Sequence, residues 1–286
     1  MLRQKAFTLI ELLVVIAVIA LLLAILLPAL KIAKQQASAA VCMSNEHQLL
    51  LIWGLYFDDN DGFVVDSDTG DTTTGYYDYG SIRIHTFVAD PQDASGIRSN
   101  TCVTDKVRGY KRGALWPYME SHKHFRCPHD TRYRKPPATD QLSFATNLIG
   151  GFRSYSMGAP FSQWSLSATG TKENLVVIEK FSEFVSPSFK IVWLEEADGA
   201  GWNHRTWNME LDEYSWVDPF AIWHNGSSTF AFADGHATRH KWLEDVTIQM
   251  AEEQTKWFST TSDDRDYRWF KKHYVPGKMP GELVLP

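Results

Sequence analysis

The stretch "KAFTLIELLVVIAVIALLLAILLPALKIAK", Lys5 to Lys34, decides the fold of this chain. Phe7 to Leu27 is apolar except for Thr8 and Glu11. As a helix that rises about 1.5 Å per residue, this run spans about 31 Å, the thickness of a bilayer core. The preceding residues, "MLRQK", are basic, so the positive-inside rule predicts a cytoplasmic N-terminus. The sequence therefore predicts one membrane span, with the rest of the chain outside the cytoplasm.

Glu11 is the unexpected residue in this run. A charged side chain in hydrocarbon costs about 3 kcal/mol or more, so an acid within a span indicates a function. The alternative is a glutamate that reaches back to the membrane surface, because Glu11 lies only one turn into the span.

The helical pattern continues beyond the span. Pro28 removes a backbone hydrogen bond and is expected to bend or loosen the helix there. The amphipathic pattern then runs to the polar cluster "DDNDG" at 58–62. We expect a long helix over 7–57, transmembrane over 7–27 and amphipathic over 28–57, followed by a head over 58–286. A secretory signal peptide cut near "QASAA", 36–40, is the alternative, but its apolar core is normally shorter than this run.

The string "AFTLIEL" at 6–12 resembles the type IV prepilin signal, in which a dedicated peptidase cuts before the Phe and methylates the new amino terminus. The resemblance implies a leader over 1–6, cleavage between Ala6 and Phe7, and Pro28 as the helix-loosening proline of the family. It also implies that Glu11 pairs with the new amino terminus of a neighbouring subunit. An ion pair in an apolar core needs both partners, so this pair would fix the register of assembly. Ala6 departs from the family, which normally has Gly before the cut.

The same resemblance implies the fold, the partners and the location. The fold would be α+β and pilin-like, a long N-terminal helix packed on a mainly antiparallel β head. The chain would be a structural subunit of a type IV pilus-like filament or of a type II secretion pseudopilus, and not an enzyme. Its partners would be prepilin peptidase and other pilin-like subunits. It would cross the bacterial inner membrane once, with its head in the periplasm or in a surface filament.

The amino-acid composition excludes several classes of protein. The 286 residues include 11 Trp, 11 Tyr and 16 Phe, enough large side chains for a core in the head. A formal charge of −6 without a basic tract argues against nucleic-acid binding. The three cysteines, Cys42, Cys102 and Cys127, form no C-x-x-C pair, which excludes a zinc ribbon or a thioredoxin-like motif. One disulfide with one thiol left over fits an oxidising compartment.

Hydrophobic patterning predicts several strands in the head. The segments 81–88, 174–179 and 189–195 are expected to be strands, and 66–81, rich in Gly, Asp and Thr, a surface loop.

The block "WHNGSSTFAFADGHATRHKW", 223–242, predicts a strand between two turns. Asp234-Gly235 is expected to form a two-residue type I′ hairpin turn. The block resembles the C-terminal His-x9-Asp-Gly signature of a large family of prepilin-type proteins, and His224, Asp234 and Gly235 match it. A strand rising 3.3 Å per residue separates the two turns by about 20 Å, so a structural role is favoured over shared metal ligation.

The stretches 42–65 and 125–128 also resemble that family. On this resemblance the expected disulfide joins Cys42 and Cys127. A Cys102–Cys127 bridge is the rival pairing.

The sequence gives little support for a catalytic site or a metal site. No Gly-x-Ser-x-Gly, H-E-x-x-H or phosphate loop is present. "DDNDG" lacks the spacing of a calcium loop, so a helix end and turn is favoured over calcium. Glu195 and Glu196 are expected to be solvated loop acids. We expect no metal and no cofactor.

A membrane-tethered carbohydrate-binding or carbohydrate-degrading protein, using exposed Trp and Tyr, is the alternative function.

Overall fold

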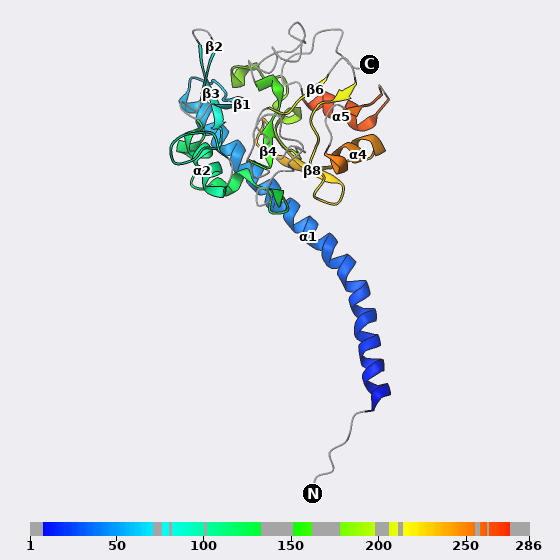
Figure 1. The fold of residues 1–286 in the computed structure, drawn as a ribbon. Coiled ribbons are helices and arrows are strands. Elements are labelled where there is room, and N and C mark those ends of the chain that lie inside the picture. The colour runs from blue at the N-terminus through cyan, green and yellow to red at the C-terminus, as the bar shows by residue number, and fades with distance from the viewer. Residues whose placement is uncertain are drawn as a thin grey trace.

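The computed structural model describes residues 8–70, 76–79, 82–99, 102–132, 151–161, 178–197, 206–210, 214–254, 258–261 and 263–274. In these ranges the chain forms a long helix that projects from a mixed α+β head (Figure 1).

Helix α1, Leu9–Asp59, runs unbroken through Pro28 and curves gently along its length (Figure 1). Its apolar N-terminal window is fully exposed, and its buried side chains begin at Ala39. The helix ends at Asn60, and the chain turns through Asp61 and Gly62, both with positive φ. The predicted long helix is therefore present, exposed where a membrane span was predicted and buried in the head beyond it.

The remaining elements follow in chain order. The strands are β1 Asp66–Gly70, β2 Tyr76–Tyr79, β3 Ile82–Ala89, β4 Tyr155–Met157, β5 Ile191–Glu195, β6 Met209–Glu210, β7 Ser215–Trp216, β8 Ser227–Phe232, β9 Ala237–Lys241 and β10 Phe258–Ser259. The α-helices after α1 are α2 Val103–Arg112, α4 Asp245–Glu253 and α5 Arg265–Tyr274. Short 3-10 turns are η1 Trp116–Tyr118, η2 His122–Phe125, η4 Ala159–Phe161, η5 Phe181–Glu183 and η6 Pro187–Phe189.

An antiparallel sheet of order β4-β5-β8-β9 organises the head. Its two central strands, β5 and β8, are buried along their whole length. Ala231 and Ala233 face the core formed with α1, whereas Phe230 and Phe232 face a second core that includes Phe270 of α5. Helix α1 therefore covers one face of the sheet and α5 the other, and small residues on the α1 side let that helix approach closely.

The prediction of a surface loop over 66–81 was wrong for residues 66–70. Asp66–Gly70 is a buried strand that pairs in parallel with β3. Its acids are hydrogen-bonded to the backbone: Asp66 accepts from the N–H of Asp68, and Asp68 from the N–H of Thr69. A polar segment can be buried when its polar groups are paired in this way, and the sequence pattern did not reveal that pairing. Tyr76–Tyr79 is also a strand, antiparallel to β3.

The predicted strands over 81–88 and 189–195 correspond to β3 and β5. The core of the strand predicted over 174–179 lies outside the described residues, which resume at Ile178. Within the described residues the head contains two antiparallel sheets and one mixed sheet, so the α+β fold class with a mainly antiparallel head is confirmed.

Candidate functional site

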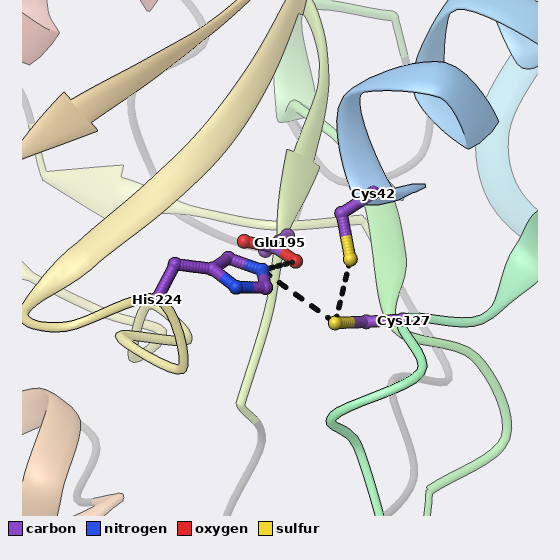
Figure 2. A group of neighbouring side chains, drawn as sticks. All are labelled: Cys42, Cys127, Glu195 and His224. Atoms are coloured by element: carbon purple, nitrogen blue, oxygen red, sulfur yellow. Dashed lines mark hydrogen bonds and ion pairs between the residues drawn. The ribbon is translucent and has the colours of Figure 1, made fainter. Parts of the chain in front are cut away.

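Four side chains from distant parts of the sequence meet where α1 enters the head (Figure 2). Cys42 comes from α1, Cys127 from the segment after η2, Glu195 from the end of β5 and His224 from the turn before β8. We call these four residues the junction cluster. Its place at the base of the head follows from Cys42, which lies less than one turn beyond Ala39, the first buried residue of α1.

The junction cluster is compact and closed to solvent. The Sγ atoms of Cys42 and Cys127 are 2.6 Å apart, and the Sγ of Cys127 is 3.6 Å from Nε2 of His224. Nε2 of His224 is also 2.9 Å from Oε1 of Glu195. One donor atom from each of the four residues lies within 4.8 Å of every other. No side chain of the cluster is more than 1% exposed.

Hydrogen bonds from α1 fix the ring of His224. Its Nδ1 lies 3.1 Å from the hydroxyl of Ser38 and 3.3 Å from the carbonyl oxygen of Gln35. Ser38 already donates its hydroxyl proton to that carbonyl, at 2.8 Å. Both groups therefore act as acceptors toward Nδ1, which must carry a proton, and Nε2 is directed at Cys127 and Glu195.

Glu195 is likewise held in one orientation. Its Oε2 accepts the backbone N–H of Thr229 at 2.9 Å, while Oε1 points to His224. Glu196, the next residue, is also buried, and its carboxylate accepts from the hydroxyl of Ser156. The prediction of solvated loop acids was therefore wrong for both residues. The paired acids do not form an open carboxylate pair, since each has its own partners within the head.

Burial and the contacts within the junction cluster set the pKa values of its side chains. Burial, together with the contact to Cys127, raises the pKa of the Cys42 thiol. Burial alone would lower the pKa of His224, but its contacts with Cys127 and Glu195 outweigh burial and raise that pKa to about 10. The cluster thus attracts positive charge strongly.

Glu46 adds a second buried acid next to the junction cluster. It lies one helical turn after Cys42 and is 0% exposed. The hydroxyl of Thr229 lies beside this carboxylate and lowers the pKa of Glu46, although the two groups are outside ordinary hydrogen-bonding geometry. Burial and the proximity of Glu195 raise the pKa of Glu46 well above its usual value.

The His-x9-Asp-Gly residues do not share a site. His224 is buried in the junction cluster, whereas Asp234 lies at the other end of β8, exposed and paired with His236 at 2.6 Å.

The residues of the β8–β9 turn also differ from the prediction. The hairpin loop contains three residues, 233–235, closed by Gly235 N–H donating to the carbonyl of Phe232 at 2.9 Å.

This loop is a type I turn followed by a glycine bulge, since Gly235 has φ +100° and Asp234 is not among the residues with positive φ. The predicted type I′ turn at Asp234-Gly235 was therefore wrong. Positive φ at both central residues occurs instead at Asn225 and Gly226, directly after His224. That left-handed pair reverses the chain between His224 and β8.

The cysteines that the sequence analysis paired are adjacent in the structure. Cys42 and Cys127 are both buried and unbonded, while Cys102 is exposed at the N-terminal end of α2. A disulfide between Cys42 and Cys127 stays a prediction from the sequence, and the metal site proposed below is the competing use of the same two thiols.

The residues predicted for processing and assembly lie at the far end of α1. Ala6 and Phe7 lie outside the described residues. Thr8 caps the helix, and Glu11 accepts its backbone N–H and its hydroxyl, both at 2.8 Å. Glu11 and Thr8 thus form a reciprocal capping box, a role that sequence reasoning missed although Thr-x-x-Glu is its signature.

The comparisons with known proteins bear on the same end of the chain. Residues 1–27 match the family described as the prokaryotic N-terminal methylation motif. No curated protein and no solved structure matches the chain. α1 is the helix in the described part of the chain that is long and apolar enough to cross a membrane. Together, the motif and this helix support a membrane-anchored substrate of prepilin peptidase with a pilin-like architecture.

Proposed function

We propose that this chain is a structural subunit of a type IV pilus-like filament or of a secretion pseudopilus. In this proposal prepilin peptidase removes residues 1–6 and methylates Phe7 in the bacterial inner membrane, and the head faces away from the cytoplasm. The observation that carries the proposal is the methylation motif over residues 1–27. Other pilin-like subunits are the expected partners.

The exposed half of α1 supports an assembly role. Leucine, isoleucine and valine are exposed on every side of the helix between Leu9 and Leu27, at 46% or more of their full area. Such a surface is stable in lipid or against other apolar helices, and not in water. Neighbouring subunits in a filament would supply those helices once the chain leaves the bilayer.

The alternative of a carbohydrate-binding or carbohydrate-degrading protein gains no support. It was predicted to use exposed Trp and Tyr, but the tryptophans in the described residues are buried or partly buried: Trp53, Trp193, Trp207, Trp216 and Trp242 are buried, and Trp116, Trp223 and Trp269 are partly buried. Their rings fill the two cores of the head.

Mass spectrometry of the protein from its native membrane tests the proposal. We expect the N-terminal peptide to begin at Phe7 and to carry one methyl group on its amine. Replacing Ala6 by Gly, the residue usual in the family, should preserve this product. Ala6→Leu should leave the leader attached, because a bulky side chain would occupy the position that normally holds a small one.

Two results would refute the processing step. One is a native terminus at Met1, and the other is a terminus near Ala40, which indicates a secretory signal peptide. Assembly is tested separately, by deleting the gene and looking for loss of filaments or of secretion.

A further inference from the structure

We propose that the junction cluster, Cys42, Cys127, Glu195 and His224, binds one zinc ion that joins the stalk helix to the head. The proposal does not depend on the filament function. It rests on the donor set, on the geometry, and on the hydrogen bonds that orient the donors.

The donor set is the one that zinc prefers. Two sulfurs, one imidazole nitrogen and one carboxylate oxygen are all established zinc ligands, and four protein ligands are typical of a structural site. Soft sulfur donors argue against calcium and magnesium, which prefer oxygen. All four residues are buried, so the site is closed to water and suited to structure instead of catalysis.

The distances allow tetrahedral coordination with small movements. Bond lengths of about 2.3 Å to sulfur and about 2.0 Å to nitrogen place two sulfurs about 3.8 Å apart and a sulfur and a nitrogen about 3.5 Å apart. Cys127 Sγ and His224 Nε2 already meet the second requirement, at 3.6 Å. The two sulfurs, at 2.6 Å, must separate by about 1.2 Å, and this lies within the reach of cysteine side-chain rotation.

The surrounding hydrogen bonds prepare the donors for a metal. Zinc-binding histidines normally donate their second ring N–H to an oxygen, which fixes the ring and raises the basicity of the binding nitrogen. His224 has this arrangement, with Nδ1 against Ser38 and the carbonyl of Gln35 and with Nε2 directed at the cluster. Glu195 is oriented in the same manner, because Thr229 N–H holds Oε2 and leaves Oε1 toward His224.

Charge favours a cation at this place. No lysine or arginine of the described residues forms an ion pair with Glu195 or with the neighbouring buried Glu46. A disulfide would use the two cysteines alone and leave Glu195 and His224 as a separate buried ion pair. A zinc ion uses all four groups, and its binding releases the protons of the thiols.

The site would have a mechanical role. Cys42 is on the stalk helix, and the other three ligands belong to separate segments of the head. Zinc would therefore fix the direction in which α1 leaves the head.

Metal and thiol analysis of the full-length protein tests the proposal. The protein is extracted from its native membrane in detergent, without reductant or chelator, and its metals are measured by mass spectrometry. We expect one zinc ion per chain and three reactive thiols after denaturation and chelation. A Cys42–Cys127 disulfide without stoichiometric zinc would overturn the proposal, and this measurement on the wild-type protein decides even if every variant fails to fold.

Variants then assign the ligands. Cys127→Ser and His224→Ala should each lose the zinc, whereas the matched control Cys102→Ser, at an exposed cysteine, should retain it. Ser38→Ala removes an acceptor of the His224 N–H without touching a ligand and should weaken zinc binding by about 10- to 100-fold. Full zinc content in well-folded Cys127→Ser would refute the assignment.

Cobalt substitution gives an independent readout. Cobalt in the wild-type site should show sulfur-to-cobalt charge-transfer absorption, which should persist in Cys102→Ser and vanish in Cys127→Ser. Absence of this absorption from cobalt-loaded wild-type protein would contradict sulfur ligation.

Discussion

Glu11 caps the N-terminus of its own helix in this structure. A test of its charge must therefore leave this cap in place. The carboxylate caps the first turn of α1 through Thr8, so removing the side chain would lose both the cap and the charge. Glutamine can also complete a capping box. The two roles are therefore separable by choice of substitution.

We expect Glu11→Gln to insert into the membrane normally but to assemble poorly, because the amino terminus of a neighbouring Phe7 would lose its anionic partner. Loss of one partner of a buried ion pair costs about 3 kcal/mol or more. Incorporation of tagged Glu11→Gln beside wild-type subunits measures this. Glu11→Ala is the comparison, because it removes the cap as well. Equal incorporation of Glu11→Gln and wild type would refute the assembly role.

Lys106 should make the stability of the head depend on pH. It is fully buried, its Nζ donates to the carbonyl of Gly151 at 2.7 Å, and burial and the charge of Arg126 lower its pKa from 10.5 to about 7. Between these values the unfolded chain binds more protons than the folded chain, so this group makes stability rise with pH, by at most about 1.4 kcal/mol per pH unit. Below pH 7 its contribution is constant.

Lys106→Met should remove that rise. We expect the variant to gain stability relative to wild type at pH 7 and to gain less at pH 9, measured by urea unfolding of the detergent-solubilised chain at both pH values. Other titrating groups contribute equally to both proteins and cancel in the difference. A stability difference independent of pH would show that Lys106 does not change its protonation on folding.

The sequence revealed the processing motif but not the junction cluster. Ala6 to Leu12 is a local pattern, readable from adjacent letters. The cluster instead joins residues 42, 127, 195 and 224, and no spacing rule connects them. The missing C-x-x-C pair argued against a zinc ribbon, but a site assembled by the tertiary fold needs no such pair. Glu195 was misjudged for the same reason, since its partners His224 and Thr229 come from the turn before β8 and from β8 itself.

Helices and strands were more predictable from the sequence than turns. The long helix, β3, β5 and the β8–β9 hairpin follow from hydrophobic periodicity. The hairpin loop type does not, because Asp-Gly fits both a two-residue turn and a three-residue loop with a glycine bulge. β1 was missed because its burial depends on hydrogen bonds to its acids and not on apolar side chains.

The glycine at the β8–β9 hairpin should be needed for conformation alone. Gly235 has φ +100°, and a Cβ placed there would meet nothing within 4 Å, so the cost of substitution is backbone strain without a clash. We expect Gly235→Val to destabilise the protein by about 1–3 kcal/mol and to lower its thermal midpoint. Gly235→Asn should lose less, because asparagine tolerates positive φ better than a β-branched residue. Equal losses in the two variants would show that the cost arises from something other than φ.

The two halves of α1 lie in different environments. Its N-terminal half projects from the head (Figure 1) and is exposed and apolar. Its C-terminal half supplies Leu49, Leu50, Ile52 and Trp53 to the core that contains residues of β5 and β8. The stalk is therefore part of the folding unit of the head, and the two should unfold together.

Substitution of Trp53 tests whether the stalk and the head unfold together. Its side chain is 1% exposed and packs edge-on against Phe57 of α1, at 5.0 Å, and against Phe181 and Phe184 of the head, both at 5.9 Å. Trp53→Ala should cost about 3–5 kcal/mol and lower the unfolding midpoint of the whole head, measured by thermal unfolding with near-ultraviolet circular dichroism. Trp53→Phe is the matched control and should cost much less, because the indole N–H has no hydrogen-bond partner among the described residues. If Trp53→Ala only exposed α1 to protease while the head kept its midpoint, stalk and head would be separate units and the shared core would be refuted.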